Sequence, residues 1–137
     1  MLLNSVQVTS AGCVDLVRFG FVTKAAAEPS CKVSYEPGPF TADASGIKVN
    51  VEGNAFVVVR CSPAYGYDFD SGSPTYNGPA VVTPADARSV QQLVETGDFE
   101  GVLTWVIGLD AQRPYTVAAA TRPHGAKFDS TLVITFS

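Results

Sequence analysis

The sequence is poor in charge. Only 16% of its 137 residues are charged, 46% are hydrophobic, and the net charge is −4. Its nine Lys and Arg residues are scattered and form no basic cluster along the chain. This pattern argues against nucleic-acid binding through phosphate contacts and against a polybasic membrane-surface patch. The length predicts one domain, 1–137, and the composition is that of a globular protein.

Potential metal ligands are also scarce. The chain has one histidine and no C-x-x-C pair, so no zinc site is expected. The run Asp68-x-Asp70-x-Gly72 is similar to the start of a calcium loop. However, its glycine is displaced by one position, and Pro79 stands where the loop needs a glutamate. We therefore expect no metal and no cofactor.

Long hydrophobic runs are absent. No segment approaches the roughly 20 apolar residues that a membrane helix needs, so no direct membrane insertion of this segment is expected. Met1–Leu3 is too short for the hydrophobic region of a signal peptide, and Asn4 ends it. Either the protein is cytosolic, or it is a mature domain to which an initiator methionine has been added; the low lysine content favours the second.

The three cysteines are Cys13, Cys31 and Cys61. An odd count allows either three buried, unpaired thiols or one disulfide with a free thiol. If a disulfide forms, Cys31–Cys61 is the pair we expect.

Short alternating runs predict strands in the first half of the chain. Val6 and Val8 indicate a short first strand, and a second follows over 13–22. The run 31–35 also alternates and is expected to be the partner of 13–22. Another strand over 47–51 is expected to end at a two-residue turn, Gly53-Asn54. The nearly apolar run 55–61 predicts a central strand covered on both faces.

The second half continues this pattern. Residues 89–95 fit either a helix or a strand, and we favour a strand because a glycine and a strand-like run follow. Further strands are expected over 102–109, from Pro114 onward and at the C-terminus, with a turn at 122–125. The fold class predicted is all-β, a sandwich or partly closed barrel of about eight mostly antiparallel strands.

Residues 62–88 interrupt the alternation as a long loop, which in a compact domain is usually functional or mobile. Tyr65, Tyr67, Phe69 and Tyr76 crowd this loop. Aromatic faces can stack on sugars and peptides, but the same side chains can also fold back and anchor the loop. Trp105 lies in an apolar strand and is expected in the core, with ligand contact as the alternative.

Candidate catalytic groups are few. Asp98 and Glu100 flank Phe99 in a hairpin tip. Such a carboxylate pair could act as acid and base, but turn aspartates usually bond the local backbone. His124 is the single histidine, and there is no G-x-S-x-G motif. We expect no catalytic residue and no enzymatic activity.

Five segments carry a family resemblance. Asp15–Phe21 is similar to a D-R-V-V-F-x-F strand, and Asn54–Val59 is similar to a G-x-A-x-L-x-V strand. Thr75–Pro79 matches a T-Y-x-G-P loop, and Gly97–Leu109 matches G-D-F-E-G…W-x-[IL]-G-L. The last segment, Arg122-Pro123 with Asp129–Phe136, is similar to a closing strand. Taken together, these segments resemble the AMIN-like domain of secreted or lipid-anchored actinobacterial proteins over about residues 5–136.

The resemblance implies a β-sandwich, because the related AMIN domains are sandwich modules of the cell envelope implicated in peptidoglycan binding. It further implies a secreted or extracytoplasmic location, with a lipid anchor in a full-length precursor as an option. The implied role is non-catalytic binding of peptidoglycan or another wall glycan; the alternative is a protein-interaction module of an envelope complex. The expected contact residues are Tyr65, Tyr67, Tyr76 and Trp105, with Asp68 and Asp98 as polar partners.

The family usually lacks the cysteines found here. A disulfide would therefore be specific to this lineage, and it would fit an oxidising compartment.

Overall fold

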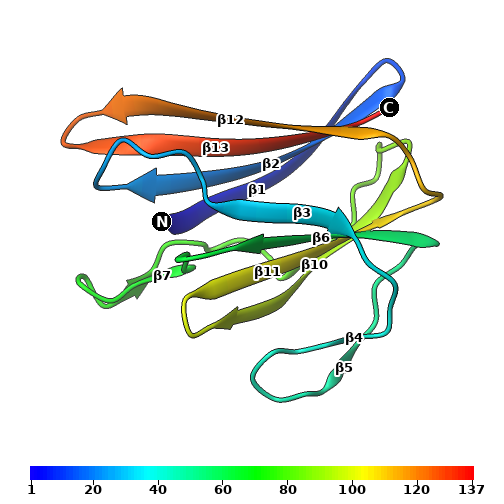
Figure 1. Ribbon diagram of the computed structural model, residues 1–137, viewed down its shortest axis with the longest axis horizontal. Coiled ribbons are helices and arrows are strands. Elements are labelled where there is room, and N and C mark those ends of the chain that lie inside the picture. The colour runs from blue at the N-terminus through cyan, green and yellow to red at the C-terminus, as the bar shows by residue number, and fades with distance from the viewer.

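The structure, a computed structural model describing residues 1–137, is a sandwich of two antiparallel sheets (Figure 1). The predicted all-β class is confirmed: there is no helix, and neither sheet closes into a barrel. The four-stranded sheet has the order β1-β2-β13-β12, with β1 Leu2–Ala11, β2 Val14–Thr23, β13 Lys127–Phe136 and β12 Tyr115–His124. The five-stranded sheet has the order β3-β6-β11-β10-β9, with β3 Cys31–Tyr35, β6 Ala55–Cys61, β11 Val102–Leu109, β10 Val90–Phe99 and β9 Val81–Val82.

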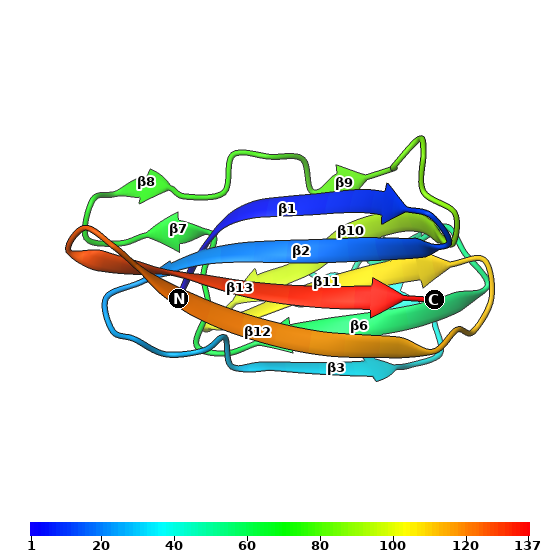
Figure 2. The same ribbon diagram turned by 90° about the horizontal axis from the view of Figure 1, so that it is seen from above.

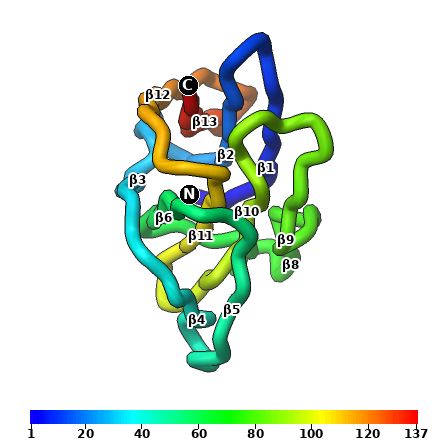
Figure 3. The backbone as a smooth tube through the Cα atoms, turned by 90° about the vertical axis from the view of Figure 1, so that its right-hand side faces the viewer, coloured from blue at the N-terminus to red at the C-terminus, as the bar shows by residue number.

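Two small hairpins lie outside these sheets. The strands of the four-stranded sheet lie over those of the five-stranded sheet, and one hairpin lies near the end of the sandwich at which β12 turns into β13 (Figure 2). The other hairpin lies under the five-stranded sheet (Figure 3). The first pairs β7 Tyr67–Asp68 with β8 Ser73–Pro74, and the second pairs β4 Phe40–Thr41 with β5 Lys48–Val49.

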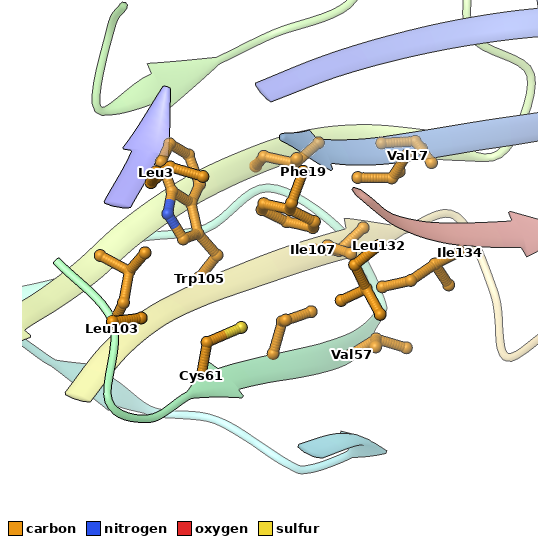
Figure 4. Close-up of a cluster of buried hydrophobic side chains, with 14 of the residues drawn as sticks. Leu3, Val17, Phe19, Val57, Cys61, Leu103, Trp105, Ile107, Leu132 and Ile134 are labelled. Carbon is orange, nitrogen blue, oxygen red and sulfur yellow. The ribbon is translucent and has the colours of Figure 1, made fainter. Parts of the chain in front are cut away.

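The core fills the space between the sheets. Val17, Phe19 and Phe21 alternate along β2 and are at most 1% exposed, because every second side chain of a strand points to the same face. They pack in one cluster with Trp105 and Ile107, which β11 of the opposite sheet contributes (Figure 4). Full burial of a side chain of this size stabilises a fold by about 1.5–3 kcal/mol.

The outer face of the five-stranded sheet is also covered. Val58 and Val106 are buried there although they lie outside the core cluster. The segment 36–54 passes close enough that a Cβ at Gly108 would collide with the carbonyl oxygen of Glu52. Gly108, the glycine of the W-x-[IL]-G-L motif, is therefore required by this close approach. The prediction that the strand over 55–61 is covered on both faces is confirmed.

Two pairing predictions are wrong. β3 pairs with β6, not with β2, because β1 and β13 occupy both sides of β2 and the chain after Thr23 crosses to the other sheet. The run 47–51 keeps only the two-residue strand β5, which pairs with β4, so Gly53-Asn54 closes no hairpin. Instead, the Asn54 N–H donates to the Leu109 carbonyl at the entry to β6.

Other boundaries shift without changing the fold. The first strand has ten residues, and 89–95 lies in β10 apart from its first residue, so the preference for a strand is confirmed. The turn predicted over 122–125 is mostly strand, since β12 runs to His124 and pairs with Lys127 across Gly125-Ala126. Pro123 is tolerated because β12 is an edge strand.

Candidate ligand-binding cleft

The aromatic loop, residues 62–88, contains an ordered hairpin formed by β7 and β8. The Asp70 N–H donates to Oδ1 of Asp68 at 3.0 Å, and the Gly72 N–H donates to the Asp68 carbonyl at 2.8 Å. The first of these bonds is the main reason why the pKa of Asp68 lies below its ordinary value. Gly72 has a φ of 72°, which an L side chain rarely adopts. Asp68 therefore stabilises a turn, and the arrangement differs from a calcium loop.

Backbone bonds dock this loop onto the start of β1. Leu3 N–H donates to the Tyr65 carbonyl at 2.7 Å, and the Tyr65 N–H donates to the Met1 carbonyl at 2.9 Å. On the other side, Oδ2 of Asp98 accepts from the Gly66 N–H at 2.9 Å. Asp98, predicted as a polar contact, thus anchors the loop to the β10–β11 hairpin.

A cleft of about 550 Å³ lies at this end of the sandwich. It lies where the start of β1, the β2–β3 connection and the β7 segment gather, at the left of Figure 1. Its volume falls in the range of small-molecule pockets, roughly 300–1,000 Å³. The apolar lining includes Met1, Leu2, Val22, Ala25, Tyr65 and Phe69.

Two aromatic rings dominate the loop side of the cleft. The centroids of Tyr65 and Phe69 are 5.4 Å apart at an interplanar angle of 87°. Phe69 is 73% exposed, although it is a large apolar side chain. Tyr67 packs edge-on against Phe69 at 5.2 Å but does not line the cleft. Phe69 belongs to the crowded loop but is not among the predicted contacts, since composition alone does not show which rings face outward.

Charged groups stand around the cleft. Nζ of Lys24 and Oδ2 of Asp70 form an ion pair of 2.8 Å that joins the two walls. Both side chains are highly exposed, and ion pairs of this kind contribute little stability, so a ligand can displace this one at small cost. Asp68, Glu28 and Lys127 complete the charged lining.

Tyr76 and Trp105 lie elsewhere. Their ring centroids are 5.7 Å apart at 84°, and the Tyr76 hydroxyl donates to the Pro79 carbonyl at 2.6 Å. Trp105 is 1% exposed and also meets Phe19, edge-on at 6.0 Å. Figure 4 shows its ring in the core near Leu3. Trp105 therefore lies in the core, as its apolar strand led us to expect, and neither residue lines the cleft.

Glu95 was missed by sequence reasoning. It lies opposite Trp105 in the β10–β11 ladder, is only partly exposed, and its carboxylate accepts no hydrogen bond from the protein. Burial, and then the charge of Asp98, raise its pKa to about 7. Burial and the charge of Glu95 also raise the pKa of Tyr76. An acidic residue directly after the apolar pair Leu93-Val94 was the available signal.

Asp15 is the most completely buried charge. It accepts from the Ser10 hydroxyl at 2.5 Å and from the N–H groups of Arg88, Ser89 and Val90 at 3.1, 2.6 and 2.9 Å. Burial alone would raise its pKa, but these hydrogen bonds outweigh burial and lower it. Asp15 therefore ties β2 to the start of β10, which is a structural role.

The cysteines and the candidate catalytic groups also have defined places. Cys31 and Cys61 form a disulfide between paired positions of β3 and β6, as predicted, while Cys13 is free and exposed. Asp98, Glu100 and His124 do not line the cleft. Nδ1 of His124 lies 2.9 Å from the Asp129 carboxylate. No three potential ligand side chains gather into a metal site, and no helix is long and apolar enough to cross a membrane.

Comparison with known proteins identifies one family. The model of the AMIN-like domain matches residues 1–136, which confirms the resemblance noted in the sequence. Searches of curated proteins and of solved structures found no match. The match spans both sheets and the cleft.

Proposed function

Because this chain belongs to the AMIN-like domain family, which is associated with the cell envelope and thus with an extracytoplasmic location, we propose that it is a non-catalytic binding module for a wall glycan. Peptidoglycan is the expected ligand. The cleft beside the aromatic loop is the site that would hold it. The observation that carries the proposal is that the exposed ring of Phe69 and the half-buried ring of Tyr65 line one cleft with charged groups.

Sugars present two kinds of surface, and the cleft matches both. Their C–H faces pack against aromatic rings, which Tyr65 and Phe69 supply. Their hydroxyl and amide groups need hydrogen-bond partners, which Asp70 and Lys24 can provide once their mutual ion pair opens. A mostly apolar pocket with a few polar groups is the usual form of a small-ligand site.

Two of the acidic groups around the cleft, Asp68 and Asp70, support binding without catalysis. A glycosidase needs one carboxyl group kept protonated by a raised pKa beside a second that is ionised. Asp68 instead has a lowered pKa and accepts backbone hydrogen bonds, while Asp70 is paired with Lys24. Glu95, whose pKa is raised, does not line the cleft.

Retention on purified, insoluble peptidoglycan tests the proposal. We expect the wild-type protein to sediment with the polymer and Phe69→Ala and Tyr65→Ala to lose at least tenfold in retention. Phe99→Ala is the matched control, because Phe99 is 47% exposed but lies outside the cleft. A wild-type protein that stays in the supernatant would contradict the proposal, and so would equal losses in Phe69→Ala and Phe99→Ala.

A second candidate function, docking of an envelope protein, is favoured by the free edge of β12. The Ser137 N–H donates to the Pro114 carbonyl at 3.2 Å, and hydrogen-bonded pairs alternate along an antiparallel ladder. The backbone groups of Val117, Ala119 and Thr121 therefore point away from β13. No charged residue or bulge protects this stretch, and Val117 is 45% exposed. An extended strand of a partner could extend the sheet here.

Crosslinking in intact cells distinguishes the two functions. A photoreactive residue at Val117 should recover one defined protein if the edge binds a partner strand. Ala119→Pro should abolish that product while preserving the fold, because the N–H it removes points outward. Val81, which is 49% exposed on a different edge, is the control position. Identical products from both positions would contradict a role for β12.

A further inference from the structure

A second hollow lies on the outer face of the four-stranded sheet. Its volume is about 200 Å³, and it is lined by Arg18, Ala120, Arg122, Asp129 and Thr131. These residues come from β2, β12 and β13, so residues more than 100 positions apart in the sequence meet only in the folded sheet.

The ladder explains why a hollow forms between two arginines. Thr131 is paired with Gly20 on one side and with Ala120 on the other, which makes a row of small residues across three strands. Arg18 lies on one side of this row, paired with Val133, and Arg122 lies on the other side, paired with Asp129. The short side chains of the row leave room between the two long ones.

Both arginines lack an acidic partner. Neither Arg18 nor Arg122 takes part in a salt bridge or donates a side-chain hydrogen bond, and both residues are exposed. The one carboxylate of the hollow, Asp129, is directed to the ring of His124 at 2.9 Å. The hollow thus holds two positive charges against one negative charge, with a threonine hydroxyl between them.

We propose that this hollow binds a single phosphate group, held by the guanidinium groups of Arg18 and Arg122 and by the hydroxyl of Thr131. Guanidinium groups donate paired hydrogen bonds to phosphate oxygens. A tetrahedral group carries enough oxygen atoms to accept from two arginines on opposite sides and from a hydroxyl. This site is separate from the proposed glycan cleft, with which it shares no lining residue.

NMR titration with inorganic phosphate at constant ionic strength tests the proposal. We expect saturable shifts of the Ala120 and Thr131 amides and of the Arg18 and Arg122 Nε–H signals. Acetate at the same concentrations should shift these signals at least tenfold less. Absence of saturable shifts, or equal responses to acetate and phosphate, would overturn the proposal.

Variants separate this site from general electrostatics. Arg18→Gln and Arg122→Gln should each weaken phosphate binding at least tenfold, whereas Arg88→Gln, which removes an exposed charge elsewhere, should leave it unchanged. Asp129→Asn should strengthen binding several-fold, a gain that misfolding would not produce. Equal effects of Arg88→Gln and Arg18→Gln, or weaker binding in Asp129→Asn, would contradict the assignment.

The source of the phosphate is found with two further probes. Binding of glycerol 3-phosphate without retention on phosphatidylglycerol vesicles assigns the site to a soluble or wall-polymer phosphate. Retention on phosphatidylglycerol vesicles, but not on phosphatidylcholine vesicles, assigns it to a lipid headgroup when Arg18→Gln abolishes it. Vesicle retention that survives in Arg18→Gln would contradict a role of this hollow at membranes.

Discussion

The aromatic rings in the two halves of the aromatic loop, residues 62–88, are opposite in placement. Tyr65 and Phe69 of the first half line the cleft, and Phe69 is 73% exposed. Tyr76 of the second half packs on the buried Trp105 and bonds the Pro79 carbonyl. The halves share a backbone connection, since the Thr75 N–H donates to the Gly66 carbonyl at 2.9 Å.

This difference shows that an aromatic-rich loop need not be a binding loop throughout. A ring with a core partner gains stability from burial and is unavailable to a ligand. A ring left exposed is available, and a cluster of exposed apolar groups is a reason to look for a ligand. The second half, called the inward half because Tyr76 packs on the core, therefore holds the loop in place. The first half, called the outward half because Tyr65 and Phe69 line the cleft, supplies the surface for a ligand.

Trp105→Ala should have the largest effect. Removing this buried ring leaves a cavity beneath Tyr76 and Phe19, and we expect the free energy of unfolding to fall by about 3–5 kcal/mol. Urea denaturation measures the change. Trp105→Phe, which keeps part of the ring, should lose less. A loss below about 1 kcal/mol in Trp105→Ala would mean that the inward half does not rest on the core.

Loss of the disulfide should come next. Cys31–Cys61 lies at the base of the outward half, where the Ser62 N–H donates to the Ser30 carbonyl at 3.0 Å. Opening a covalent loop of sequence separation 30 should lower the free energy of unfolding by about 2–4 kcal/mol in the Cys31→Ser, Cys61→Ser double variant. Cys13→Ser, which changes a free and exposed thiol, is the control. Equal stability of the double variant and the control would contradict this expectation.

Glu95→Gln should stabilise the protein at alkaline pH. The folded state raises the pKa of Glu95 from 4.5 to about 7, so it binds this proton more tightly than the unfolded state. Wild-type stability should therefore fall as the pH rises from about 4.5 through 7, and the variant should lack this loss. At pH 8 we expect a gain of roughly 1–2 kcal/mol, reduced from the full shift because the group is partly solvated.

Urea denaturation at pH 8 and at pH 5 measures the effect of Glu95→Gln, and the gain should shrink at the lower pH. Glu100→Gln, an exposed carboxyl in the adjacent turn, is the control. A gain that is the same at both pH values would mean that burial of Glu95 beneath the inward half is not its cause.

Phe69→Ala should have the smallest effect on stability, within about 0.5 kcal/mol, because its ring has little core contact to lose. Thermal unfolding of this variant beside the wild type checks the expectation. A destabilisation comparable to that of Trp105→Ala would erase the distinction between the two halves. Unchanged stability together with lost peptidoglycan retention would establish it.

Several features of the fold were predictable because they depend on short-range patterns. The alternation of Val17, Phe19 and Phe21 indicates a strand with one buried face, whatever that strand pairs with. The neighbours of 89–95 correctly favour a strand over a helix. The bridge between Cys31 and Cys61 is the preferred pairing, but local pattern does not require it, since three cysteines allow several outcomes.

The candidate site was less predictable. Of the six expected contact residues, Tyr65 and Asp68 line the cleft, while Tyr67, Tyr76, Asp98 and Trp105 do not. Exposure of a ring depends on whether a distant residue packs against it, as Trp105 does for Tyr76. Glu95 and the Arg18–Arg122 pair were overlooked for the same reason: their environment is made by strands that are remote in sequence.

Most of the long strands, the all-β class and the family could be read from the sequence, because period-two alternation and motif spacing are local properties of the chain. Only the tertiary structure decided that β3 joins β6 rather than β2, that one half of the aromatic loop turns outward, and that Arg18 and Arg122 share a hollow. The physical reason is that pairing between strands, and the burial that follows from it, depends on which complementary faces meet across many residues of chain. A local pattern specifies a face but not its partner.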